Sequence, residues 1–162
     1  MSALRIDVAD LLTHPGARRS LQLDVVLDGL GTPVARIDAP VHLAVVLERV
    51  PDGVVVRGEL RARWDANCSI CLRDLHGELT VGVAELYEPH PLADGDTYPI
   101  DGHELDLEQL VRDALVLELP LVPTCDRPDC APAASPGVLV GADEPTGAPS
   151  DPRWAALSEL DL

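Results

Sequence analysis

The chain has 162 residues and a formal net charge of −16, and all twelve of its positively charged side chains are arginines. This charge argues against simple electrostatic binding to nucleic acid, which needs clustered basic side chains, and it favours high solubility or a basic partner. The length fits one domain with a tail. Because there is no phenylalanine, and only two tryptophans and two tyrosines, leucine and valine must fill the core.

The first residues lack a basic region followed by an apolar core and a cleavage site, so we expect no secretory signal. No apolar run approaches the ~18 residues that indicate a membrane-spanning helix. We therefore expect a cytoplasmic protein with no membrane partner. Thiols stay reduced in the cytoplasm, so closely spaced cysteines indicate metal or redox chemistry before structural disulfides.

Alternating apolar and polar residues predict an antiparallel sheet over the first half of the chain, because a period of two places successive side chains on opposite faces of a strand. After a short lead-in strand and one helical turn, strands are expected at 21–28, weakly at 34–38, and at 40–49. Pro51-Asp52-Gly53 then has the composition of a hairpin turn.

The clearest alternation runs through residues 54–67. Its apolar side chains share one face, and Arg57, Arg61 and Arg63 lie on the other. This arginine stripe is either a solvated surface whose charges are paired with acids or a contact surface for RNA phosphates. A returning strand is expected at 78–87, so the residues between the two strands form the tip of a β-hairpin.

Residues 106–119 carry several signals of a helix. Asp106 is a good N-cap, and Gln109 three residues later completes a capping-box pattern. Apolar residues then recur at helical spacing, and Pro120 should end the helix. Because such a helix would cover one face of the sheet, the expected fold class is α+β: an antiparallel sheet, open or barrel-like, with one main packing helix.

Composition divides the chain into three parts. Residues 1–130 are expected to form a single α+β domain that contains the paired cysteines. Residues 131–149 are rich in proline and alanine and have the composition of a flexible linker. In residues 150–162, Asp151 as N-cap and Pro152 at the first helical position predict a short C-terminal helix.

The cysteines form two pairs, Cys68/Cys71 at the expected hairpin tip and Cys125/Cys130 far downstream. Zn²⁺ prefers four soft or borderline ligands at tetrahedral corners, and a CxxC turn supplies two of them. A zinc site made by both pairs would fasten the Pro-rich segment to the hairpin and stabilise the fold. His76 is close enough in sequence to Cys71 to be a substitute ligand.

Two alternatives for the cysteines stay open. One is a redox pair formed by Cys68 and Cys71, although this pair lies on a hairpin and not at a helix N-terminus, where a thiolate is usually stabilised. The other is a set of inert thiols. Elsewhere the sequence shows no nucleophile with a recognisable base, no phosphate-binding glycine loop and no HExxH motif. We therefore expect no enzyme and no small-molecule substrate.

The order of these features resembles the YceD family, the large ribosomal RNA subunit accumulation proteins. The resemblance rests on these segments: Cys68-Ser69-Ile70-Cys71-Leu72 after a strand, Asp106-Leu107 opening a helix, Leu117-Glu118-Leu119-Pro120 at its end, the Cys125–Cys130 segment, and Asp151-Pro152-Arg153-Trp154 with Ala155-Ala156-Leu157. The chain departs from the family pattern at two places. Residues 131–137 contain no further cysteines, and the first pair encloses Ser-Ile where a basic residue is usual.

The resemblance implies a non-enzymatic ribosome-biogenesis factor needed for the accumulation or processing of large-subunit (23S) rRNA. Its partner would be this rRNA in the pre-ribosome, or a basic large-subunit ribosomal protein, which a charge of −16 would suit. Two readings from other classes remain: a cytosolic thiol redox protein that uses Cys68 and Cys71, and a protein-interaction adaptor whose Trp154 helix docks into a partner's groove.

Overall fold

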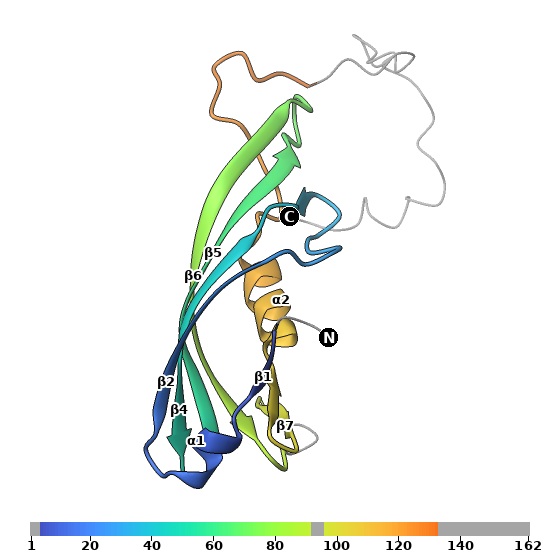
Figure 1. Cartoon of the computed structure of the whole chain (residues 1–162). Helices are drawn as coiled ribbons and strands as arrows, with labels where there is room; N and C mark the ends of the chain where they lie inside the picture. Colours follow the sequence, from blue (N-terminus) through green and yellow to red (C-terminus); the bar gives the residue numbers. More distant parts are fainter. Residues whose placement is uncertain (1–3, 92–95, 133–162) are drawn as a thin grey trace, which may run out of the picture. The chain divides into compact units, whose positions relative to one another are not determined.

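The structure, a computed structural model, describes residues 4–91 and 96–132, and these residues are mostly β-strand. Strands hold 49% of them and helices 14%. In chain order the elements are β1 (Arg5–Asp7), α1 (Ala9–Thr13), β2 (Arg18–Val25), β3 (Ala35–Arg36), β4 (Val41–Val50), β5 (Gly53–Asn67), β6 (Asp74–Glu88), β7 (Tyr98–Asp101), β8 (Glu104–Asp106) and α2 (Leu107–Glu118). Figure 1 shows their arrangement.

The strands form one sheet in the order β1-β8-β7-β6-β5-β4-β2, with β3 paired to β5 beside this path. Strands β5 and β6 are the longest, with 15 residues each, and they pair antiparallel from Val54 opposite Tyr87 to Asn67 opposite Asp74. The sheet curls into a half-barrel, and α2 lies against its concave side (Figure 1). The β5–β6 hairpin extends past the end of β4, whose ladder with β5 begins at His42 opposite Arg61.

The expected α+β class is wrong, because the described part of the chain is a curled, mostly β half-barrel with only two helices. Two features of the strands explain the difference. The β5–β6 pairing continues through Asp74–Gly77, where the composition favours a turn over a strand. Residues 88–103 are expected to be loop with a possible short strand at Thr97–Ile100; that strand is present as β7, and β8, which was not expected, follows it and pairs with β1. The curled sheet therefore encloses more of the hydrophobic core than the two helices do.

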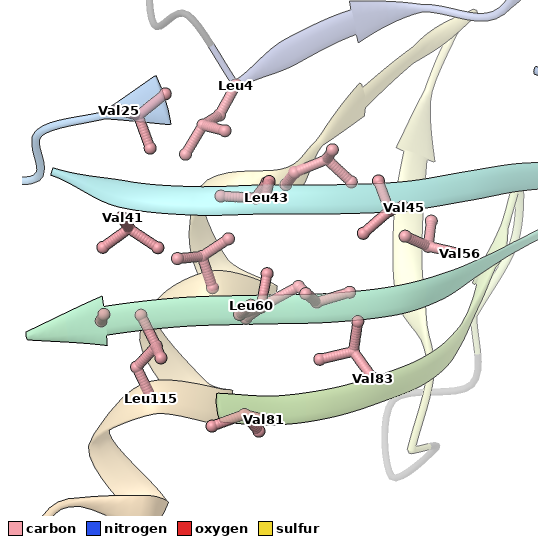
Figure 2. Close-up of a cluster of buried hydrophobic side chains, with 14 of the residues drawn as sticks. Leu4, Val25, Val41, Leu43, Val45, Val56, Leu60, Val81, Val83 and Leu115 are labelled. Carbon is pink, nitrogen blue, oxygen red and sulfur yellow. The ribbon is translucent and has the colours of Figure 1, made fainter. Parts of the chain in front are cut away.

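The core is aliphatic, as the composition predicts, and it lies between the concave side of the sheet and α2. Figure 2 shows Leu43, Val56 and Leu60 of the sheet pointing to the same interior as Leu115 of α2. No polar or charged residue in the described ranges is buried. The aromatic exception is Tyr87, which is fully buried and whose hydroxyl donates a hydrogen bond of 3.0 Å to the carbonyl oxygen of Asp106.

The start and the end of α2 are confirmed. The Asp106 side chain accepts a hydrogen bond of 2.9 Å from the backbone N–H of Glu108, and the backbone leaves helical geometry at Leu119, before Pro120. The predicted capping-box contact of Gln109 is wrong, because its side-chain amide donates a hydrogen bond of 2.8 Å to the Asp113 carboxylate. The buried face of α2 consists of Leu107, Leu110, Val111 and Leu115.

The hairpin turn at 51–53 and the helical turn at α1 are confirmed. The linker expected at 131–149 and the helix expected at 150–162 fall almost wholly outside the described residues, which end at Pro132. In the ranges that the structure describes, no helix has both the length and the apolar character needed to cross a membrane.

Candidate metal centre

The first cysteine pair lies in the connection between β5 and β6, at the tip of the hairpin, as predicted. Two backbone hydrogen bonds shape this connection: the Cys68 N–H donates to the Arg73 carbonyl oxygen over 2.8 Å, and the Leu72 N–H donates to the Cys68 carbonyl oxygen over 2.9 Å. The turn closes at Leu72, whose φ of 59° lies in the left-handed region. We name residues 68–73 the knuckle.

The second cysteine pair reaches the knuckle on the segment that follows α2. The Ser69 N–H donates a hydrogen bond of 2.7 Å to the Pro123 carbonyl oxygen, which brings the two stretches of backbone together. The Cys125 N–H then points at the Cys68 sulfur at 3.4 Å. Arg73 and Asp129 close the arrangement with an ion pair of 2.9 Å. These contacts place Cys125 and Cys130 beside the knuckle.

The four cysteine sulfurs form one compact cluster, with all Sγ atoms within 4.8 Å of one another. The Sγ atoms of Cys71 and Cys125 are 3.6 Å apart, and those of Cys68 and Cys130 are 3.8 Å apart. A Zn–S bond of ~2.3 Å in tetrahedral geometry gives an S···S separation of about 3.8 Å. The donor set and its spacing therefore fit a tetrahedral Zn²⁺ ion. No cysteine of the cluster is in a disulfide.

The surroundings of the sulfurs favour a negative charge at Cys68. Hydrogen bonds from the backbone N–H groups of Cys71 and Ile70 lower the pKa of the Cys68 thiol to about 6. At Cys130 a hydrogen bond to the Cys125 sulfur, together with burial, raises the pKa of the thiol to about 12. The Cys68 thiol therefore ionises more readily than the Cys130 thiol. A cation at the centre would offset the repulsion that opposes four thiolates.

His76, the substitute ligand considered from the sequence, does not belong to this cluster. It is exposed on β6, opposite Asp65 of β5. The residues that position the second pair, Ser69, Pro123, Arg73 and Asp129, were also not found from the sequence. For the last two residues a signal exists, because opposite charges stand next to cysteines of the two pairs, two positions after Cys71 and one position before Cys130.

The arginine stripe lies on the convex face of β5, and all three of its side chains are exposed, as the alternation predicts. The Arg61 Nε donates to Glu59 over 2.6 Å, and the Arg63 Nε donates to Glu78 over 2.9 Å. Arg57 has no ion pair within the described ranges. Two of the three charges are therefore balanced by neighbouring carboxylates, and RNA binding by this stripe stays a prediction.

A comparison with protein families decides the identity of the chain. The family model described as large ribosomal RNA subunit accumulation protein YceD matches residues 56–161, a stretch that includes the knuckle, α2 and both cysteine pairs. The chain belongs to the YceD family. The family description points to a role connected with the accumulation of large-subunit ribosomal RNA.

Relatives in mycobacteria resemble the chain over nearly its whole length. Proteins of Mycobacterium tuberculosis and Mycobacterium bovis, both described as uncharacterized, are 36% identical over 172 aligned residues, which cover 98% of this chain and 82% of each relative. An uncharacterized protein of Mycobacterium leprae is 32% identical, with 99% of this chain and 78% of the relative covered. No solved structure matches the YceD chain significantly.

Proposed function

We propose that this YceD protein is a non-enzymatic factor of large ribosomal subunit biogenesis, needed for the accumulation of 23S rRNA, in which the four cysteines hold a structural Zn²⁺ ion. Family membership supports the biological role. The four-sulfur cluster is the observation that supports a structural site, since four protein ligands fill a tetrahedral zinc site. Catalytic zinc sites keep one position open for water or substrate.

The scarcity of buried side chains around the second cysteine pair supports the metal proposal. From residue 121 to residue 132, Pro123 is the one buried residue, and Leu121 and Val122 expose 80% and 69% of their surface. The segment therefore gains little from hydrophobic burial, which is the main force that holds chain segments in place. Zn²⁺ bound by sulfurs from both stretches would supply that attachment, because metal binding is coupled to local folding.

The thiol redox function is the second candidate, and the lowered pKa of Cys68 favours it. Two observations argue against it. Cys68 has no exposed surface, so a substrate disulfide could not reach its sulfur. The short sulfur contacts join Cys68 to Cys130 and Cys71 to Cys125, and so they run between the two pairs. The adaptor function rests on Trp154, which lies outside the described residues.

A protein partner is better supported than direct contact with RNA. Phosphate binding depends on basic side chains that are free to replace counterions. In the arginine stripe, Arg61 and Arg63 are already paired with carboxylates. Of these three arginines, Arg57 is the one that has no ion pair with a described residue. With a net charge of −16, the chain would attract a basic protein of the large subunit.

Affinity capture from cells under two conditions tests this proposal. The tagged protein is recovered from extract with and without ribonuclease treatment, and the bound proteins and RNA are identified. We expect large-subunit ribosomal proteins to remain bound after the ribonuclease step. Recovery without any large-subunit component would contradict the proposal. Metal analysis of protein purified without chelator tests the zinc site in the same preparation, and intact protein with no bound zinc would exclude it.

A further inference from the structure

Exposed aliphatic side chains gather at the knuckle and at the segment beside it. Ile70 and Leu72 of the knuckle expose 43% and 62% of their surface, and Leu121 and Val122 expose 80% and 69%. Ile70 and Val122 are the chain neighbours of Ser69 and Pro123, and the backbone hydrogen bond between Ser69 and Pro123 brings the two stretches side by side. We name these four residues the aliphatic collar. Contiguous apolar residues on a surface commonly mark an interaction site.

Leu72 of the collar has a backbone conformation that is unfavourable for leucine, and the stability of the fold does not account for a leucine at this position. Its φ of 59° is the one positive value of a non-glycine residue within the described ranges. Glycine adopts this conformation without steric cost, whereas a leucine side chain crowds the backbone there. The leucine gains little burial in return, because 62% of its surface is exposed. A residue that is unfavourable in the isolated fold at an exposed site indicates a function outside that fold.

The charges around the collar indicate the chemistry of its partner. The two stretches 65–76 and 121–130 carry four aspartates, Asp65, Asp74, Asp126 and Asp129, against two arginines, Arg73 and Arg127. Arg73 is neutralised by Asp129. A Zn²⁺ ion with four thiolates would add a further net charge of about −2. An apolar surface within a negative field fits a cationic segment that also carries apolar side chains.

RNA fits this surface less well. Proteins that bind single-stranded RNA stack its bases on aromatic side chains and hold its phosphates with basic ones. The large apolar side chains that are exposed in the described residues are all leucine, isoleucine or valine. The local excess of carboxylates would also repel phosphates. The occupant that the observations favour is therefore a protein.

We propose that the aliphatic collar is the docking surface for a cationic, apolar-containing segment of a partner protein. This inference rests on the proposed function, in which that partner is a basic protein of the large ribosomal subunit. Half of the collar comes from the hairpin and half from the segment after α2, and the cysteine cluster joins the two halves. Metal binding therefore sets the shape of the docking surface, and loss of the metal separates its halves.

Binding measurements on the full chain with defined probes test the proposal. Purified large-subunit ribosomal proteins are titrated one at a time, and transcribed fragments of 23S rRNA form a second arm. The test variants are Leu72→Gly and Val122→Ser. The matched control is Val26→Ser. Val26 exposes 62% of its surface, as Leu72 does, and it lines a pocket with Asp28 and Arg112 that contains no cysteine.

We expect at least one basic protein to bind and each collar variant to weaken its binding about tenfold, as central apolar contacts of interfaces commonly do. Leu72→Gly should keep its zinc and keep or raise the melting temperature, since it relieves an unfavourable backbone conformation. That combination distinguishes a docking residue from one that only supports the fold. Val26→Ser should bind like the unaltered chain.

Three outcomes would overturn the proposal. The first is unaltered binding by both collar variants, which would leave the biogenesis role intact and move the docking surface elsewhere. The second is binding of no basic protein by the unaltered chain, which would remove the protein partner itself. The third is tight binding of the rRNA fragments that the collar variants weaken, which would assign the collar to RNA.

Discussion

The backbone N–H of Ser69 donates a hydrogen bond of 2.7 Å to the carbonyl oxygen of Pro123. This bond joins the tip of the long β-hairpin to the segment that follows α2, and it lies between the two cysteine pairs. Its consequence is that a site made from distant parts of the sequence depends on a short stretch of backbone contact.

Removal of the proposed Zn²⁺ ion should loosen the second cysteine pair while the half-barrel stays folded. The core cluster contains no residue of the segment 121–132, and Pro123 is the one buried residue of that segment. We expect a strong chelator to speed the hydrogen exchange of the Cys125 and Cys130 amides while the amides of β4 and β5 keep their protection. Equal loss of protection in both regions would show that the cysteine cluster supports the whole fold.

Replacement of one ligand should have the same effect without a chelator. Cys125→Ser removes one thiolate from the cluster of four, so zinc should be lost, and limited proteolysis should produce cuts between residues 119 and 132 that the unaltered protein does not show. The matched control is Ser69→Ala, because Ser69 contacts Pro123 through its backbone and its side chain is outside the cluster. Full zinc content in Cys125→Ser would contradict the four-sulfur site.

Two neighbouring residues of α2 should respond very differently to truncation. Leu115 is fully buried, and Leu115→Ala should lower the free energy of unfolding by about 2–5 kcal/mol through lost burial and a cavity. Leu117 exposes 83% of its surface, so Leu117→Ala should change the free energy of unfolding by no more than about 0.5 kcal/mol. Urea denaturation measures both, and similar values for the two variants would contradict the packing of α2.

The close approach of β5 and β6 predicts another contrast. A Cβ atom at Gly53 would lie 1.8 Å from the Tyr87 carbonyl oxygen, and neither backbone can move without disturbing the ladder. Gly53→Ala should therefore destabilise the protein by about 1–3 kcal/mol. A Cβ atom at Gly82 would meet nothing within 4 Å, so Gly82→Ala should have little effect on the melting temperature. The prediction is wrong if the Gly82 variant is the less stable one.

The local elements could be predicted from the sequence where one pattern dominates. The alternation at 54–67 gave β5 to within one residue, and Asp106 with Pro120 gave both ends of α2. Asp74–Gly77 could not be predicted as strand, because its residues are poor strand formers and are held there by pairing with β5. The fold class was missed for a similar reason, since periodicity does not show how far a sheet curls or how small a part of it one helix covers.

The sequence predicted which four cysteines form the candidate site, but it did not predict the contacts that bring the two pairs together. The spacing of the cysteines indicated which four sulfurs would meet, and the structure brings them within 4.8 Å of one another. The contact between Ser69 and Pro123 uses backbone atoms, which leave no mark in the sequence. The positive φ of Leu72 was equally hidden, because turns of this kind usually signal themselves by a glycine.

The most direct test of the central claim is the ribosome profile of cells depleted of this YceD protein, measured by gradient sedimentation with quantification of 23S and 16S rRNA. The account predicts a deficit of mature large subunits and a fall in 23S relative to 16S rRNA, restored by the unaltered gene and restored less by Cys125→Ser. A normal profile with an unchanged rRNA ratio in depleted cells would contradict the account.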